Sequence, residues 1–596
     1  MRRIHRGTTI LLALGLLACQ GVGSKKVEAR RVEWKHKGKT AELVLAGRIM
    51  EAKGLGAMFA TRKVVLYDLL ARMKKAAGDP KIGAILLRIE NPLGGWAQYA
   101  EVRQALLSLR HAGKLVVAYL PEGSNGPYYL ASAADKVVMP AGATLWLMGL
   151  RSEVMFFKGL LDKIGIVADF LHVGKFKGAV EPLTRSSMSG PLKESMKTLV
   201  DSLYRAFLVE TARGRGKKSS WLEHLMAEGP HQALQAKKAG LIDDVMDLHA
   251  LRARLGGEGS ILPRYGIVKK KPDLSKLLGM LQGLDMSSKP TKPFLALVVA
   301  SGPIVMSESS DPFDFSDVIA ADKLVKALDD LSKEKKAAAV VLRIDSPGGS
   351  ALASELIWQA VRRLDKVKPV VVSMGNVAAS GGYYMASAAR LVYAEPNTIT
   401  GSIGVLGGKM VLAGLFKKIG VTVDSVQAGP GGAVFSVTRP FSKEERRVVQ
   451  AMMERTYDLF VSRVAEGRHK SKKAVAAVAQ GRVWAGSDAV RNGLVDRLGG
   501  LSDALAQARR LGRLGSKAPL LVRPRPKNPI RLLMERLGGG QSVRWAGGNG
   551  LDFSSLALLA RLAPGMGLQA AALARSVTCL ARERVLAVLP FGLWIH

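Results

Sequence analysis

Cysteine and histidine are both scarce in this chain, and each scarcity excludes a kind of chemistry. Only Cys19 and Cys579 occur among 596 residues. A framework of disulfides therefore cannot hold the fold, and no disulfide is possible if Cys19 is modified. None of the nine histidines falls in the glycine-rich turns described below. A proton acceptor at those turns must be another type of residue.

Long apolar runs are also missing. Beyond the N-terminus no stretch offers 18 uncharged apolar residues, so we expect no polytopic membrane protein. The short run from Ile10 to Ala18 follows a basic start and precedes Cys19, which is typical of an export signal. LLAC (16–19) resembles a bacterial lipobox, so we predict a lipoprotein signal peptide over 1–19 and lipidation of Cys19. The alternative is a non-lipidated signal or simple anchor with an incidental cysteine.

Acidic residues are few, with 49 Asp and Glu against 88 Lys and Arg, which gives a net charge of +39. Such an excess predicts an acidic partner, either nucleic acid or an anionic membrane surface. The basic residues are spread along the chain, and no zinc-finger, basic-zipper or RNA-recognition motif organises them. We therefore expect an anionic membrane surface as the partner and no nucleic acid.

The chain carries one unit twice. The two copies match at an offset of 255 residues or within two residues of it. Matching pairs are LVLAGRI (43–49) with VVASGPI (298–304), AILLRIENPLGG (84–95) with VVLRIDSPGGS (340–350), PYYLASAA (127–134) with GYYMASAA (382–389), and AGLIDDV (239–245) with NGLVDRL (492–498). We predict an N-terminal repeat domain over 40–250, a linker over 251–292, a C-terminal repeat domain over 293–505, and an extension of unknown role over 515–596.

Each copy alternates short β-branched runs with amphipathic patterns. FLALVVA, AAVVLRI and PVVVSM predict buried strands because they are continuously apolar. ADKLVKALDDLSK, SELIWQAVRRLDK and the segment 443–466 predict helices. Strands alternating with helices favour parallel pairing, so each copy should be an α/β domain. In the extension, PLLVRPRPKNP (519–529) is Pro/Arg-rich and predicts extended chain, and 551–585 has a helical pattern.

A serine stands at the tip of a turn in the second copy only. Ser380 lies where a predicted strand runs into a helix, close to the positive end of the helix dipole. The same position in the first copy is Asn125. A second glycine-rich turn, DSPGGS (345–350), ends a neighbouring strand, so the amides of Gly349 and Gly381 could face one oxyanion. From spacing alone, the alternative that both turns merely connect strands to helices stays open.

A lysine shows the opposite asymmetry. Lys177 in HVGKFKGAVEPLTR (172–185) falls on Gly431 or Gly432 of VQAGPGGAVFSVTR (426–439). One copy thus has lysine without serine, and the other has serine without lysine. A buried lysine whose pKa is lowered can activate a serine hydroxyl. The alternative for any lysine in so basic a chain is a solvated surface charge.

FKGAVEP, DSPGG and AASGGYY, together with the order of the two copies, resemble the signal peptide peptidase A family in its long two-domain form, protease IV. The resemblance covers about 40–505 and implies two tandem crotonase/Clp-protease-like domains, related by internal duplication, and a membrane-bound homotetramer. It implies Ser380 as nucleophile, Lys177 as general base and acid, and Ser402, 22 residues beyond Ser380, as the group that orients the lysine. No metal or cofactor is expected. The chain departs from the family in its expected lipid anchor, where the long form keeps an anchor helix, and in the tail after 515.

The function expected on this basis is a serine endopeptidase with a Ser/Lys dyad. It would degrade cleaved signal peptides and other unfolded hydrophobic peptides, and would be lipid-anchored on the periplasmic side of the bacterial cell envelope. Two alternatives stay open. One is a lipoprotein scaffold that binds peptides without cutting them. The other is a crotonase-type acyl-CoA enzyme, although no carboxylate lies in the turn around Ser380.

Overall fold

The structure is a computed structural model that describes residues 33–52, 63–267, 290–308, 317–523, 585–588 and 594–595. The predicted signal peptide with Cys19 and the helical pattern up to residue 584 lie outside these residues. No helix in the described ranges is long and apolar enough to cross a membrane.

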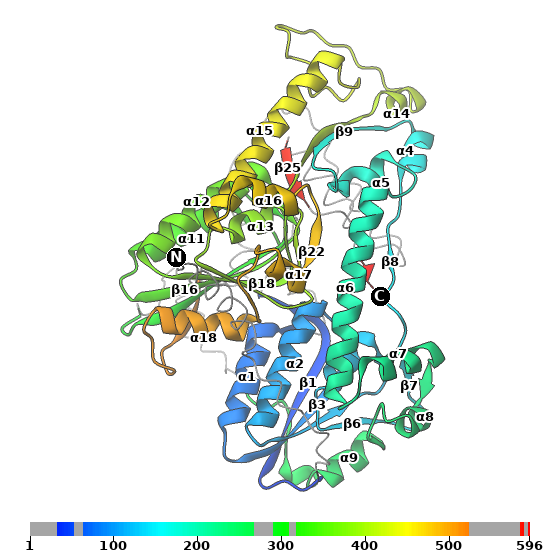
Figure 1. The fold of residues 1–596 in the computed structure, drawn as a ribbon, viewed down its shortest axis with the longest axis vertical. Coiled ribbons are helices and arrows are strands. Elements are labelled where there is room, and N and C mark those ends of the chain that lie inside the picture. The colour runs from blue at the N-terminus through cyan, green and yellow to red at the C-terminus, as the bar shows by residue number, and fades with distance from the viewer. Residues whose placement is uncertain are drawn as a thin grey trace, which may run out of the picture.

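The first repeat is built on a parallel sheet, shown at the bottom of Figure 1. Its strand order is β11-β6-β4-β3-β1-β12, with β2 paired to β1. The strands are β1 (Lys39–Met50), β2 (Lys63–Val65), β3 (Ile82–Leu93), β4 (Leu115–Tyr119), β6 (Lys136–Met139), β11 (Asp244–Val245) and β12 (Ile261–Leu262). The helices are α1 (Leu66–Gly78), α2 (Trp96–His111), α3 (Asn125–Ala131), α7 (Ser219–Glu228), α8 (Ala233–Lys238) and α9 (Leu248–Arg254). The strand centres are almost wholly buried, as continuously apolar runs predict.

The second repeat has the corresponding sheet, in the order β22-β20-β18-β16-β13-β24, with β19 paired to β18 and β23. The strands are β13 (Phe294–Ser301), β16 (Ala337–Ser346), β18 (Val370–Ala379), β19 (Leu391–Ala394), β20 (Ile399–Gly401), β22 (Val483–Ala485), β23 (Arg497–Leu498) and β24 (Leu520–Arg523). Its helices are α11 (Ala321–Lys333), α12 (Ala351–Val367), α13 (Gly381–Ala386), α16 (Lys472–Val478), α17 (Gly486–Arg491) and α18 (Leu501–Leu511). The predicted strands and helices of this copy are confirmed, and so is the α/β class with its duplication. β12 falls in the predicted linker and β24 in the predicted extension.

A third sheet joins the two repeats, in the order β15-β14-β17-β25-β21-β9. Its strands are β9 (Val167–Val173) from the first repeat, β14 (Ile304–Val305), β15 (Ile319–Ala320), β17 (Gly348–Ser350) and β21 (Val405–Val411) from the second, and β25 (Val585–Val588) from the tail. β9 pairs with β21 antiparallel along seven residues. Beside it, in the upper part of Figure 1, lie η2 (Gly178–Val180), α4 (Lys158–Ile164), α5 (Glu181–Thr184), α14 (Ala413–Lys418) and the long helix α15 (Lys443–Gly467). The long helix α6 (Gly190–Gly214) runs from near α5 down to α7 of the first repeat.

Short strands complete the edges of the first repeat. β5 (Gly123–Ser124), β7 (Thr144–Trp146) and β10 (His231–Gln232) form a small sheet, and η3 (Glu258–Ser260) precedes β12. β8 (Ser152–Glu153) pairs with β26 (Trp594–Ile595) of the tail.

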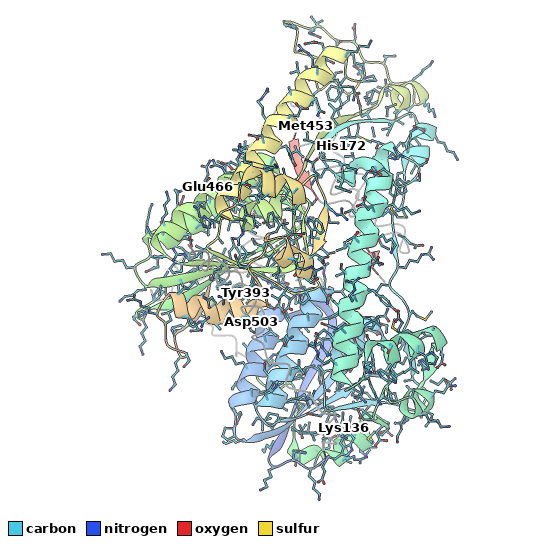
Figure 2. All side chains as sticks on the ribbon, in the orientation of Figure 1. Lys136, His172, Tyr393, Met453, Glu466 and Asp503 are labelled. Atoms are coloured by element: carbon cyan, nitrogen blue, oxygen red, sulfur yellow. The ribbon has the colours of Figure 1, made fainter. Side chains whose placement is uncertain are left out.

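The repeats share a core where α18 enters the junction. Leu501, Ala504 and Ala508 of α18 pack with Tyr393 into the hydrophobic cluster of the first repeat. Figure 2 labels Tyr393 and Asp503 at this junction. Because apolar side chains of the second repeat are buried in the core of the first, the two repeats form one packed body and are not separate domains joined only by a linker.

Candidate active site

Three segments converge on one buried point, and they come from both repeats of the same chain. Lys177 follows β9, Ser380 lies between β18 and α13, and Ser402 follows β20. The Lys177 Nζ lies 2.7 Å from the Ser380 Oγ. It also donates to the Ser402 carbonyl at 2.9 Å and contacts the Ser402 Oγ at 3.0 Å. The exposed fractions of these side chains are 1%, 0% and 0%. The serine that only the second repeat carries and the lysine that only the first repeat carries therefore meet at one shared site.

Burial changes the proton affinity of this lysine. Removal of the Lys177 ammonium from water lowers its pKa well below 10.5, the ordinary lysine value, and no charged neighbour opposes the shift. The three hydrogen-bonding atoms around Nζ belong to neutral serine groups. A neutral amine keeps a lone pair, so it can accept the proton of the Ser380 hydroxyl. The surface-charge alternative does not describe Lys177.

The backbone of Lys177 is held by the second repeat. Pairing of β9 with β21 brings the strand across, and the Phe176 N–H donates to the Gln480 carbonyl at 2.7 Å. Gly481, with φ of +78°, lies against the same turn, and a methyl group there would sit 2.6 Å from the Lys177 nitrogen. Only glycine tolerates both that approach and that backbone angle. The sequence reasoning missed Gln480 and Gly481, although AQG (479–481) repeats AEG (227–229) and could have drawn attention to them.

Ser380 has a backbone conformation that is rare outside glycine. Its φ is +55° and its ψ is −116°. Its N–H donates to the Gly401 carbonyl at 2.8 Å, and its carbonyl accepts from Tyr384 of α13 at 2.8 Å. These bonds hold the turn in place although the φ angle is unfavourable for a residue with a Cβ. Such strained turns at the end of a strand project a side chain away from both elements.

Gly349 and Gly381 lie next to each other beside this turn. A methyl group on Gly381 would sit 3.2 Å from the Gly349 nitrogen and 2.5 Å from the Ser354 Oγ. Gly381 is the first residue of α13, so its N–H has no acceptor within the helix. Gly349 and Gly381, the two glycines singled out from the sequence, are thus brought together at this turn. Ser354, which packs against Gly381, was not singled out from the sequence.

The equivalent turn of the first repeat is closed. Asn125 accepts a hydrogen bond from the Met148 N–H at 3.0 Å. Next to it, a methyl group on Gly126 would lie 2.6 Å from the ring of Tyr99. The Tyr99 hydroxyl donates to the Pro92 carbonyl at 2.6 Å, so the ring is held over the glycine turn. The residue aligned with Tyr99 in the second copy is Ala353, which has no ring to lie over the glycine turn. The first copy thus lacks the serine hydroxyl, and an aromatic ring lies over its glycine turn.

A buried charge network fixes the strands that lead to the site, and the sequence reasoning missed it as well. Arg343 of β16 donates to both carboxylate oxygens of Glu51 at 2.8 and 3.0 Å, and its ion pair with Glu101 measures 2.6 Å. Glu51 and Glu101 belong to the first repeat. Burial is the main cause that raises the pKa of Glu101 to about 7. Asp345, two residues after Arg343, accepts from the Val377 N–H at 2.9 Å and so ties β16 to β18 just before Ser380.

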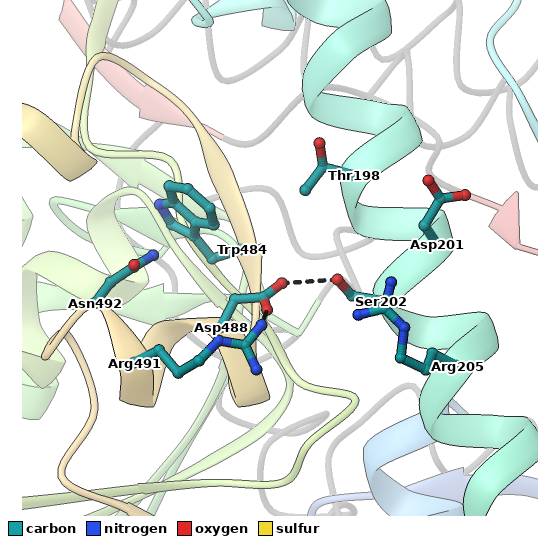
Figure 3. Close-up of a pocket in the computed structure, with 8 residues that line it drawn as sticks. All are labelled: Thr198, Asp201, Ser202, Arg205, Trp484, Asp488, Arg491 and Asn492. Atoms are coloured by element: carbon teal, nitrogen blue, oxygen red, sulfur yellow. Dashed lines mark hydrogen bonds and ion pairs between the residues drawn. The ribbon is translucent and has the colours of Figure 1, made fainter.

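A surface hollow of about 330 Å³ lies between α6 and the β22–α17 segment (Figure 3). It is lined by Thr198, Asp201, Ser202, Arg205, Trp484, Asp488, Arg491 and Asn492. Ser202 donates to Asp488 at 2.8 Å across the hollow, which links the first repeat to the second. None of the dyad residues lines it. Among the described ranges no three His, Cys, Asp or Glu side chains gather in a way that could hold a metal ion.

Comparison with known proteins agrees with the duplication. The sequence matches Peptidase family S49 over residues 108–258 and 362–514, and Clp protease over residues 314–400. It is 34% identical over 515 residues to the chloroplastic serine protease SPPA of Arabidopsis thaliana. That alignment covers 85% of this chain and 73% of the Arabidopsis protein. It is 35% identical to Protease 4 of Haemophilus influenzae over 76% of this chain and 73% of that protein. It is 31% identical to Protease 4 of Salmonella typhi over 75% of this chain and 72% of that protein. The chain therefore belongs to peptidase family S49 and is a serine protease of the signal peptide peptidase A type.

Proposed function

We propose that this serine protease is an endopeptidase for unfolded hydrophobic peptides, including cleaved signal peptides, with Ser380 as nucleophile and Lys177 as general base. One observation carries the assignment. The buried Lys177 Nζ lies 2.7 Å from the Ser380 Oγ, and its hydrogen-bonding neighbours carry no carboxylate. An acyl-CoA enzyme of this fold would need a carboxylate acid or base at that point, so the geometry favours peptide hydrolysis.

The reaction follows from the positions of these groups. Lys177 takes the proton from the Ser380 hydroxyl as the oxygen attacks the scissile carbonyl. The amides of Gly349 and Gly381 stabilise the oxyanion. Lys177 then protonates the leaving amine, which departs with the C-terminal product. Water next gives a proton to Lys177 and attacks the carbonyl carbon of the acyl-enzyme. As the ester bond breaks, Lys177 returns that proton to the Ser380 Oγ, which releases the N-terminal product and restores both groups. Ser402 holds the lysine amine in line through both steps.

The third sheet supports an extended peptide as substrate. β17 carries Gly349, and β21 lies two strand positions away from it in the sheet, with the width of one strand, β25, between them. A strand in this slot can hydrogen-bond through its backbone to both neighbours. Backbone pairing is tolerant of side-chain identity but requires an extended chain, so it selects unfolded segments over folded domains.

The pH dependence of nucleophile labelling tests this function. A fluorophosphonate probe should label Ser380, and the rate should rise with pH as Lys177 loses its proton. Because the pKa of Lys177 is lowered, half of the maximal rate should be reached well below pH 10.5. Below that pKa Lys177 is protonated and labelling of Ser380 is slow, and above it Lys177 is neutral and labelling is fast. In the Lys177→Met variant the rise should vanish. An unlabelled Ser380 would point to the peptide-binding scaffold, and a rise only near pH 10.5 would contradict a neutral resting lysine.

We also infer that the chain works at an anionic membrane surface, where its lipid anchor on Cys19 would hold it on the periplasmic side of the bacterial envelope. The net charge of +39 supports this. A Cys19→Ala chain, which cannot be lipidated, should float with vesicles that contain anionic lipid and not with neutral vesicles, because each basic residue near such a surface adds about 1 kcal/mol. Added salt should release it. Equal flotation with both vesicles would refute the electrostatic contribution. The assembly of four copies stays a prediction.

A further inference from the structure

The slot between β17 and β21 is filled by a strand from the far end of the same chain. β25 pairs antiparallel with β17, which places Gly348 opposite Val588, Gly349 opposite Ala587 and Ser350 opposite Leu586. On its other side it pairs antiparallel with β21, with Leu406 opposite Leu586 and Gly407 opposite Val585. The tail thus meets both strand edges that a substrate would use.

The position of β25 along the slot coincides with the reactive point. Ala587 faces Gly349, one of the two amides proposed to hold the oxyanion, and Gly349 adjoins Gly381, the residue after Ser380. β25 also packs against α13, the helix that follows Ser380. On the outer side of β21, Leu406 pairs with His172 of β9, which is labelled in Figure 2. The sheet therefore continues from the tail strand through β21 to β9, the strand that precedes Lys177. The tail strand therefore lies beside Gly349 and the helix that follows Ser380.

The tail is held at a second place. Trp594 pairs with Glu153 and Ile595 with Ser152, so β26 adds to β8 of the first repeat. The sequence of β25 is VLAV, an apolar segment of the kind proposed as substrate. These features favour one register of the tail in the slot.

We propose that residues 585–588 are an internal occupant of the substrate slot, which competes with incoming peptides for the edges of β17 and β21. The proposal rests on the proposed function because it concerns the same slot. A tethered occupant raises the apparent Kd of a peptide in inverse proportion to the fraction of time that the slot is free. It also covers two strand edges that would otherwise be open to pairing with other chains. Substrate must displace the tail, so activity should depend on how firmly the tail is held.

Peptide binding to a non-cutting chain tests the proposal. The test variant is the full-length chain with Ser380→Ala and, in the tail, Ala587→Pro, which removes one backbone N–H donor from β25. The matched control is Ala587→Ser, which keeps that donor. The probe is a fluorescein-labelled synthetic peptide of residues 581–592, followed by anisotropy. The proline variant should bind it about tenfold or more tightly than the serine control. Equal Kd values for the two variants would overturn the proposal.

A second measurement separates an occupant from a permanent structural strand. If β25 merely completes the sheet, Ala587→Pro should lower the midpoint of thermal unfolding and leave the peptide Kd unchanged, which also overturns the proposal. A probe peptide that itself carries Ala587→Pro should not bind either chain. Because binding is measured without Ser380, a failure of the proposed peptidase chemistry would appear in fluorophosphonate labelling and not here.

Discussion

Replacing Ser380 with Ala, or Lys177 with Met, should lower kcat/KM for a fluorogenic hydrophobic peptide by at least about a thousandfold. Without Ser380 no acyl-enzyme forms. Without Lys177 the hydroxyl keeps its proton, because the structure brings no other base to the Ser380 Oγ among the described residues. The two groups act as one unit, so the double variant should be no slower than either single variant. Initial rates at several peptide concentrations give the result directly.

Two further variants make this test specific. Lys175→Met removes an exposed lysine two residues from Lys177 and should leave kcat/KM within about twofold, because an exposed charge near a site has a small effect. Ser402→Ala removes one of the three contacts of the Lys177 amine. It should lower kcat/KM by roughly ten- to a hundredfold, a loss between those of Lys175→Met and Lys177→Met. Wild-type activity in Lys177→Met, or equal losses in Lys175→Met and Lys177→Met, would refute the dyad.

Arg343→Met should destabilise the whole body of the enzyme. The guanidinium is fully buried and is paired with both Glu51 and Glu101, so its loss leaves two carboxylates without a counter-charge. Removal of one partner from such a pair costs about 3–5 kcal/mol. For a cooperative unit the size of one repeat, roughly 150–250 residues, this lowers the thermal midpoint by roughly 6–20 °C, and for the two repeats unfolding together by less. Calorimetry or circular dichroism on the purified full chain measures it.

The duplicated chain supplies a matched control for that variant. Arg88 is the counterpart of Arg343 in the first copy, and it pairs with Glu42 at 2.9 Å. Its side chain is 23% exposed, so water takes over part of the solvation when the pair is broken. Arg88→Met should therefore lower the midpoint far less than Arg343→Met. Equal shifts in the two variants would mean that the junction network does not stabilise the fold as proposed.

Much of the fold was predictable from the sequence because its signals are local or repeated. Apolar runs such as FLALVVA and VVLRI become central strands, since only buried strands tolerate such continuity. The offset between the copies gave the two matching sheets. The same offset exposed the exchange of Ser380 for Asn125 and of Lys177 for a glycine, and that exchange singled out Ser380 and Lys177 before any distance was known.

The contacts between distant segments were not predictable in the same way. Nothing local in Glu51, Glu101 or Gly481 indicates that they lie against Arg343 or Lys177, because those partners are hundreds of residues away or in the other copy. The pairing of β9 with β21, and of β25 with both β17 and β21, depends on edges that exist only after the sheets have formed. Short strands of two to four residues also carry too little periodicity to be recognised from sequence.

The sequence by itself determined the α/β class, the duplication, the family and the complementary pair Ser380 and Lys177. It left open whether that pair meets within one chain or between two. Tertiary structure decided that it meets within one chain, since β9 crosses to β21 and carries Lys177 to the Ser380 Oγ. It also lowered the lysine pKa by burial and laid the tail across the slot. These properties arise from desolvation and strand edges, which belong to the packed molecule and not to any short stretch of residues.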